Sequence, residues 1–140
     1  MPGLNVLVIG GGGREHAICI GLDDSASVDS IHAAPGNAGT SLVGTNHPVP
    51  ASDVEGLITL ADELGADLVV VGPEAPLVDG LADSLRAAGV ACFGPHSDGA
   101  RLEGSKLHAK RVMQSLGVPT GGCVVVEDAS SIKTALDSFE

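Results

Sequence analysis

A run of four glycines near the amino terminus is the first feature of this 140-residue sequence that points to chemistry. Gly10–Gly13 follow the apolar segment Leu4–Ile9 and precede Arg14. Glycines let a backbone pass close to a ligand, and the N–H groups at the start of a following helix attract anions. The pattern predicts a phosphate-binding turn, and a glycine turn without a ligand is the alternative.

The spacing of these glycines does not match a dinucleotide site. In the pattern Gly-x-Gly-x-x-Gly, the third glycine falls on Glu15 when counting starts at Gly10. It falls on His16 when counting starts one residue later. The next predicted strand ends in Ala33-Ala34-Pro35, without the acidic residue that holds a ribose hydroxyl in such sites. A nicotinamide cofactor is disfavoured, and the dinucleotide-binding domain of an oxidoreductase is kept as the alternative function.

Two further segments are expected beside the glycine turn. Pro35–Thr40 follows the predicted strand Ser30–Ala34, and Gly72–Pro76 follows the predicted strand Leu68–Val71. The carboxyl ends of the strands in an open parallel sheet form the ligand crevice. Because Glu74 lies between two prolines, we expect a stiff loop to present its carboxylate to sugar hydroxyls or to an amine. A solvated loop glutamate is the alternative.

Other polar residues give weaker patterns. Asn37 and Thr40 either contact a ligand or cap the segment that follows them. Gly99–Lys106 has the glycine spacing of a P-loop, but its serine and lysine are in the inverted order and the segment is predicted to be helical. The five histidines lack metal-ligand spacing, and no nucleophile motif is present in the sequence.

Charge and composition restrict the partners. Eighteen acidic residues against seven Lys and Arg give a formal net charge of −11, which argues against nucleic acid and against an anionic membrane. An anionic metabolite remains compatible, since backbone N–H groups can hold a phosphate. Salt adaptation and an ordinary acidic protein explain the acidic bias equally well.

The compartment is predicted from the cysteines and from the absence of a membrane segment. Cys19, Cys92 and Cys123 lie in apolar stretches without a CxxC pattern, so we expect three buried free thiols in a reducing compartment. The amino terminus lacks the basic start of a secretory signal, and no apolar run approaches the ~20 residues of a membrane span. We therefore expect a cytoplasmic protein.

The apolar periodicity up to Pro95 predicts an α/β fold. Short apolar runs predict four strands: the three already named and a fourth at Val90–Phe93. These strands alternate with amphipathic segments. The expected helices are Arg14–Leu22, a segment opened by Ser52 and Glu55 as a capping box and ending near Gly65, and Leu77–Ala88. Strands joined by helical crossovers predict a doubly wound parallel sheet.

The pattern changes after Pro95. Ser97–Gly117 is predicted as two helices divided near Gly104-Ser105. A strand at Cys123–Val126 and a last helix, capped by Asp128 or Ser130, follow. That helix is predicted to be still running at Phe139-Glu140, which suggests a truncation.

An ordered set of segments resembles one family, phosphoribosylamine–glycine ligase of purine biosynthesis. A single glycine loop is a weak signal, but this set covers nearly the whole chain in the family's order. The matching segments are Gly11–Ala17, Ala34–Thr40, Val71–Gly80, Phe93–Pro95, Leu102–Lys106 and Val118–Thr120.

The resemblance implies a Rossmann-like, doubly wound domain over residues 1–104 and the truncated start of an ATP-grasp domain over residues 105–140. It implies a reaction that joins glycine to 5-phosphoribosylamine with ATP and Mg²⁺, through an acyl phosphate of glycine. In this family the Mg²⁺ ligands lie beyond residue 140, so the fragment is expected to be inactive alone. A non-catalytic nucleotide-sensing module of 140 residues is a further alternative.

The resemblance also assigns the site residues. Gly11, Gly12, Gly13 and Arg14 would line the phosphoribosylamine pocket, with Glu74 on the ribose. Two single residues complete the set: Asn37 as a further contact in that pocket, and Lys106 as a contact to the ATP phosphates.

Overall fold

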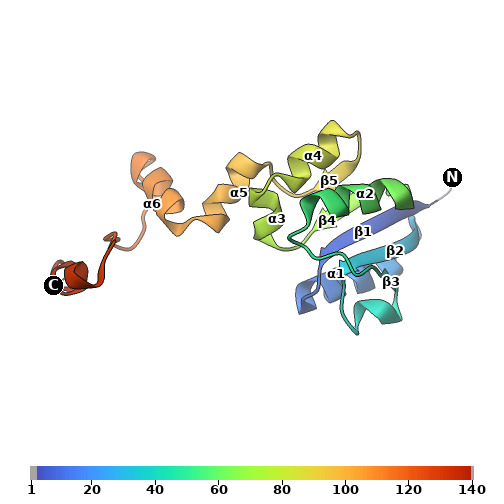
Figure 1. Ribbon diagram of the computed structural model, residues 1–140, viewed down its shortest axis with the longest axis horizontal. Helices are drawn as coiled ribbons and strands as arrows, with labels where there is room; N and C mark the ends of the chain where they lie inside the picture. The colour runs from blue at the N-terminus through green and yellow to red at the C-terminus, as the bar shows by residue number, and fades with distance from the viewer. Residues whose placement is uncertain (1–2, 140) are drawn as a thin grey trace. The chain divides into compact units, whose positions relative to one another are not determined.

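The computed structural model, which describes residues 3–139, divides into two compact units at Ala100 and Arg101. The first unit contains a five-stranded, fully parallel sheet in the order β3-β2-β1-β4-β5 (Figure 1). Its strands are β1 (Leu4–Gly10), β2 (Val28–Pro35), β3 (Thr45–Asn46), β4 (Leu68–Val71) and β5 (Ala91–Phe93). The peptide bond between Ala34 and Pro35 is cis.

Helices lie between these strands. They are α1 (Gly13–Asp23), the short 3₁₀ helix η1 (Thr40–Leu42), α2 (Val54–Leu64), α3 (Glu74–Val78) and α4 (Leu81–Ala87). One more helix, α5 (Ser97–Gly104), follows the last strand. The chain proceeds outward from β1 to β2 and β3, and then returns to the other side of β1 for β4 and β5. The order of the strands therefore reverses between β1 and β4.

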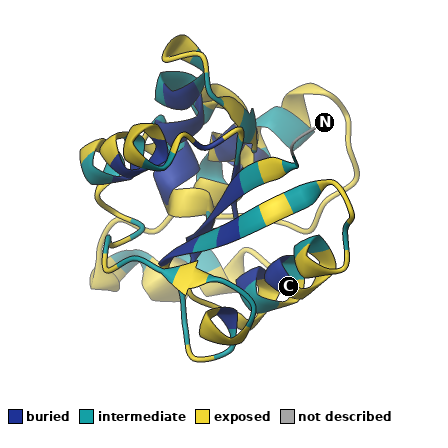
Figure 2. Ribbon diagram, turned by 90° about the vertical axis from the view of Figure 1, so that its right-hand side faces the viewer, coloured by how far each residue is buried: buried dark blue, intermediate teal, exposed yellow. Residues whose placement is uncertain are grey.

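Strand β1 is buried on both faces because its alternate residues enter two different hydrophobic clusters. Leu7 and Ile9 belong to the cluster that α2, α3 and α4 cover, whereas Val6 and Val8 belong to the cluster that α1 covers. Figure 2 shows the buried residues gathered along the sheet and on the helix faces that meet it. Helices on both faces explain the continuous apolar runs of the strands and confirm the predicted doubly wound parallel sheet.

Two helical predictions in the first unit are wrong in detail. The segment Leu77–Ala88 is not one helix: Gly80, with φ of +89°, separates α3 from α4 because a left-handed residue cannot continue an α-helix. The N-cap of α2 is Asp53 rather than Ser52, since the helix begins at Val54. Its carboxylate accepts the N–H of Gly56 at 3.0 Å.

The sequence analysis also missed β3. Thr45 and Asn46, which follow the predicted segment Pro35–Thr40 in the chain, pair with His32 and Ala33 of β2. Two residues are too few to produce an alternating pattern, so this pairing is decided by the fold and not by local periodicity.

The second unit contains α6 (Lys106–Ser115), the 3₁₀ helix η2 (Ala129–Ser131) and α7 (Ile132–Asp137). The predicted division near Gly104-Ser105 is confirmed, with Ser105 as the N-cap of α6. Asp128 caps η2 by accepting the N–H groups of Ser130 and Ser131 at 2.8 and 3.1 Å. Helix α7 ends at Asp137 and not at the predicted Phe139-Glu140, of which Glu140 lies outside the described residues.

The predicted strand at Cys123–Val126 is wrong. These residues are exposed and irregular, and no strand of the described second unit pairs with them. A short apolar run becomes a strand only where a neighbouring strand accepts its backbone hydrogen bonds.

The three cysteines are free thiols in different surroundings. Cys19 is fully buried and Cys92 half-buried, and burial raises the pKa of both thiols. Cys123 is exposed, so the prediction of three buried thiols is wrong at this position. Across residues 3–139, the helices are too short or too polar to cross a membrane.

Candidate functional site

The predicted glycine turn lies at the point where the strand order reverses. Ile9 of β1 pairs with Val71 of β4, so Gly10, the last residue of β1, and Gly72, which follows β4, lie at the same edge of the sheet. Open α/β sheets bind ligands at this position, outside the carboxyl ends of the strands. The fold therefore brings the first and third predicted segments together.

The glycine turn leads directly into helix α1. Gly12 is the N-cap and Gly13 the first helical residue, and Gly11, Gly12, Gly13 and Arg14 are all exposed. The first N–H groups of a helix have no partner within it and carry the positive end of the helix dipole. At α1 these groups belong to residues 13–15, and the exposed Arg14 side chain adds a full positive charge beside them.

Glu15 is a residue of this site whose role the sequence analysis missed. Its side chain is only 6% exposed, and its Oε2 accepts the N–H of Gly12 at 2.7 Å. Oε1 lies 3.1 Å from Nε of Arg14. An acidic residue three positions after a helix N-cap is the spacing of a capping box, and this signal was readable in the sequence.

The Glu15 carboxylate also explains several of the glycines. A Cβ added at Gly10 would lie 2.7 Å from Cγ of Glu15, and one added at Gly72 would lie 2.6 Å from its Cδ. Gly10 in addition has φ of +124°, which L side chains rarely adopt. These glycines therefore make room for a side chain of the protein itself, besides any ligand.

Asn37 connects the loop after β2 to the glycine turn. Its side-chain amide donates to the carbonyl oxygens of Gly11 and Gly12, each at 3.0 Å, and its Oδ1 accepts the N–H groups of Gly39 and Thr40. Both amide hydrogens and both acceptor positions are thus used within the chain. Asn37 lies beside the predicted pocket, where this geometry gives it a positioning role.

A second contact holds the same loop against α1. The imidazole of His16 packs directly on Gly39, where a Cβ would collide with the ring. The hydroxyl of the fully buried Thr40 lies 2.7 Å from Oδ1 of Asn46, which anchors the loop to β3. The loop Pro35–Thr40 is therefore fixed from two sides, and it lies at the sheet edge where it was predicted.

Glu74 lies in a helix, contrary to the expectation of a stiff loop. It is the first residue of α3, with Pro73 as the N-cap and Pro76 within the first turn. Prolines are tolerated there because first-turn N–H groups have no acceptor within the helix. The Glu74 side chain is exposed, and the residue comes shortly after β4, the strand that pairs with β1.

Lys106 belongs to the second unit. It is the first residue of α6, it is exposed, and it directly follows the Ser105 cap. Its assignment to ATP phosphates stays a prediction.

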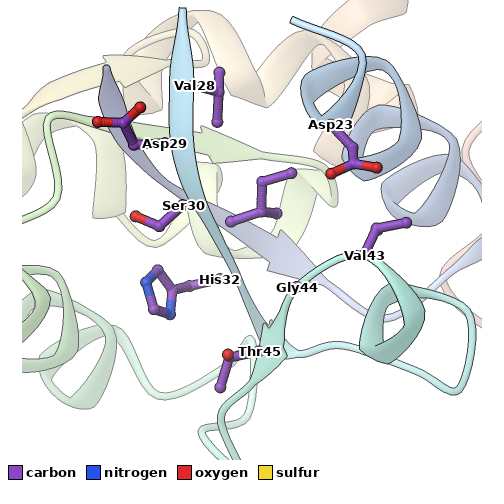
Figure 3. A pocket seen from close by; sticks show the side chains of 9 residues that line it. Asp23, Val28, Asp29, Ser30, His32, Val43, Gly44 and Thr45 are labelled. Carbon is purple, nitrogen blue, oxygen red and sulfur yellow. The ribbon is translucent and has the colours of Figure 1, made fainter. Parts of the chain in front are cut away.

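A hollow of about 260 Å³ lies at the outer edge of β2, apart from the predicted site residues. Figure 3 shows the side chains of Asp23, Ser30 and His32 around it. His32 Nδ1 lies 2.9 Å from Nε2 of His47, and burial followed by the charge of His47 lowers the pKa of His32. Within residues 3–139, His, Cys, Asp and Glu side chains form no group of three that would hold a metal ion.

Comparison with known proteins identifies the family of this chain. Residues 4–103 match the family "Phosphoribosylglycinamide synthetase, N domain". A phosphoribosylamine–glycine ligase of Streptomyces coelicolor is 52% identical over 97% of this chain and 33% of that protein. The corresponding ligase of Mycobacterium bovis is 48% identical over 97% of this chain and 32% of that protein.

A solved structure shows the same fold. The crystal structure of phosphoribosylamine–glycine ligase from Thermotoga maritima matches with a TM-score of 0.71 and 31% identity, over 98% of this chain and 31% of that one. The chain thus spans about a third of the length of the curated relatives it matches. It belongs to the phosphoribosylglycinamide synthetase N-domain family, as the sequence resemblance implied.

Proposed function

We propose that this chain supplies the phosphoribosylamine-binding part of a phosphoribosylamine–glycine ligase of purine biosynthesis. The observation that carries the proposal is the exposed start of α1 at the reversal of the strand order, with Arg14 beside it and Glu74 at the start of α3, which follows the adjacent strand β4. A single phosphate suits the N–H groups of Gly13 and Arg14. A carboxylate such as Glu74 suits the hydroxyls of a ribose.

The proposed roles follow the positions of the residues. The pocket is lined by the backbone of Gly11, Gly12 and Gly13, which lets the sugar phosphate come close to the main chain. Arg14 balances part of the negative charge of the phosphate. Glu74 orients the ribose. Asn37 positions this backbone segment through its two hydrogen bonds to the carbonyl oxygens of Gly11 and Gly12.

The complete reaction is proposed from the family. The γ-phosphoryl group of ATP, with Mg²⁺, is transferred to the carboxylate of glycine, which gives glycyl phosphate and ADP. The amine of phosphoribosylamine then attacks the acyl carbon, loses a proton and displaces inorganic phosphate, which forms the amide bond. The part of this chemistry that the chain provides is the orientation of the amine. Lys106 is a suitable residue type for contact with the ATP phosphates, because its ammonium group is positively charged and exposed. It lies at the start of a helix, a position that itself favours anions.

We propose that these 140 residues bind the ribonucleotide without completing turnover, since the relatives are about three times as long. The cytoplasmic location and the absence of nucleic-acid and membrane partners stay predictions. The alternative of an oxidoreductase domain is disfavoured by the family match and by Glu15, which stands where a dinucleotide site has its third glycine.

A titration tests the proposal. The ¹⁵N-labelled chain is titrated with glycinamide ribonucleotide, the stable product, and separately with NAD. Saturable amide shifts at residues 11–14 and at Glu74 are expected with the ribonucleotide. Glu74→Gln is expected to weaken its binding, whereas Glu63→Gln, an exposed site on α2, is expected to leave it unchanged. Shifts with NAD alone would favour the oxidoreductase domain instead.

A further inference from the structure

The buried carboxylate of Glu15 lies at the place where an α/β sheet normally receives its ligand. Its side chain is enclosed by Gly10 at the end of β1, by Gly12 in the turn and by Gly72 at the end of β4. A Cβ at Gly12 would lie 2.9 Å from Oε2, and the Gly12 N–H already donates to that oxygen at 2.7 Å. A negative charge of the protein therefore occupies the inner end of the anion-binding turn.

The position of Glu15 matters because of the glycines before it. Gly10 and Gly12 match the first two glycines of Gly-x-Gly-x-x-Gly, and Glu15 stands at the third. In dinucleotide sites the third glycine lets helix and strand pack closely, and the diphosphate lies across the helix start. Here a carboxylate replaces that glycine and holds an N–H group from the same turn.

We infer that Glu15 restricts the turn to ligands with a single phosphate group. The inference rests on the proposed phosphate pocket and makes Glu15 a specificity-determining residue of it. The carboxylate holds the inner N–H, which leaves the first-turn N–H groups of Gly13 and Arg14 for one external phosphate. A second phosphate at Gly12 would compete for an N–H that is already bonded, and it would do so beside a like charge.

The experiment compares phosphate with pyrophosphate on the ¹⁵N-labelled 140-residue chain. The variant Glu15→Gln removes the charge and keeps the shape and an oxygen acceptor for Gly12, and glutamine is an accepted residue at this capping position. The amide of Gly12 reports on the inner position, and the amides of Gly13 and Arg14 report on the outer one. Glu63→Gln is the matched control, because it removes one carboxylate charge from the exposed surface of α2.

Glu15→Gln is expected to raise the affinity for pyrophosphate relative to phosphate by about tenfold or more, the scale on which a charge a few ångströms away acts near a protein surface. The Gly12 amide is expected to shift with pyrophosphate in this variant and not in the parent chain. The inference would be overturned if Glu15→Gln left the ratio of pyrophosphate affinity to phosphate affinity unchanged, or if Glu63→Gln raised this ratio equally. It would also be overturned if pyrophosphate caused no shift of the Gly12 amide in Glu15→Gln.

The result separates this inference from the proposed function. If glycinamide ribonucleotide fails to bind the parent chain but Glu15→Gln gains pyrophosphate binding at Gly12, the charge effect stands and the ligase pocket fails. If the ribonucleotide binds at residues 11–14 and the pyrophosphate ratio does not change, the pocket stands and the role of Glu15 fails.

Discussion

At the scale of single residues, the glycines of the candidate site are constrained by what lies next to them. Gly72 leaves no room for a methyl group because Glu15 lies against it, whereas Gly21 in α1 has open space where its Cβ would be. Both glycines have backbone angles outside the left-handed region. A substitution at these two positions therefore causes no strain from a left-handed backbone.

The substitution Gly72→Ala is expected to destabilise the first unit by about 1–3 kcal/mol, the usual cost of overpacking. Gly21→Ala is the control and is expected to stabilise it by about 0.5–1 kcal/mol, because alanine is the better helix former. Urea unfolding of both variants measures the difference. Equal stability of Gly72→Ala and the parent chain would show that the Glu15 side chain does not lie against Gly72.

A second residue-scale feature is the contact of Asp83 on α4 with His96, which follows β5. Asp83 accepts from the imidazole of His96 and from the N–H of Ser97 at 2.8 Å. The hydrogen bond from His96, followed by that from Ser97, lowers the pKa of Asp83 from 3.8 to about 2. The ionised carboxylate is therefore favoured in the folded state.

This shift predicts part of the acid sensitivity. Because the folded pKa lies below the unfolded value, the stabilisation is present above pH 3.8 and is lost as the pH falls toward about 2. Asp83→Asn is expected to lose less stability than the parent chain over this interval. Asp62→Asn, on the exposed side of α2, serves as the control and should follow the parent curve. Unfolding midpoints at several pH values measure the effect, and parallel curves for Asp83→Asn and the parent chain would contradict it.

At the scale of elements, the loop after β2 holds the glycine turn in position through hydrogen bonds and packing. Asn37 bonds the turn with its amide and bonds its own loop with its carbonyl, and His16 of α1 packs on Gly39. The short strand β3 fixes the far end of the loop to β2. The turn is therefore positioned by an element that follows it by more than twenty residues.

Asn37→Ala is expected to destabilise the first unit by about 1–2 kcal/mol, since it leaves carbonyl and N–H groups on both loops without partners. Hydrogen exchange should become faster at the amides of Gly39 and Thr40, which lose their acceptor. Ser41→Ala removes an exposed hydroxyl bonded only within the loop, to the carbonyl of Ala38, and should change stability by less than about 0.5 kcal/mol. Unchanged exchange at Gly39 would contradict this positioning role.

At the scale of the whole molecule, the chain contains two compact units, and α5 is the element at the boundary between them. Ala100 of this helix is 4% exposed and belongs to the core cluster on the α2 face of the sheet. The predicted domain limit at residue 104 keeps α5 whole. A limit before Ser97 would remove Ala100 from the core.

A chain of residues 1–104 is therefore expected to unfold at the same urea concentration as the 140-residue chain. A chain of residues 1–96 should unfold at a lower concentration, because it loses a buried methyl group and the helix that carries it. Circular dichroism during urea titration measures both midpoints. A large loss of stability in the 1–104 chain would place the limit of the folding unit later in the sequence.

The sequence by itself determined the fold class, the buried strands and the family. The continuous apolar runs Val6–Ile9 and Leu68–Val71 are typical of strands buried on both faces, so a parallel sheet covered by helices was predictable from the residues alone. The ordered family segments were equally readable, because they are local strings of residues. The spacing of Glu15 as a capping residue was also readable in the sequence, whereas the burial of its side chain was not.

Only the tertiary structure decided which groups meet. The Glu15 carboxylate against Gly72, Asn37 on the carbonyls of the glycine turn, and β3 on β2 join segments far apart in the chain. Local periodicity carries no information on such contacts. The same reason explains Cys123–Val126, which has the composition of a strand but no strand beside it in the described unit. A side chain's neighbours across the sheet are set by the packing of the whole domain, and this packing buries the Glu15 carboxylate between Gly10, Gly12 and Gly72.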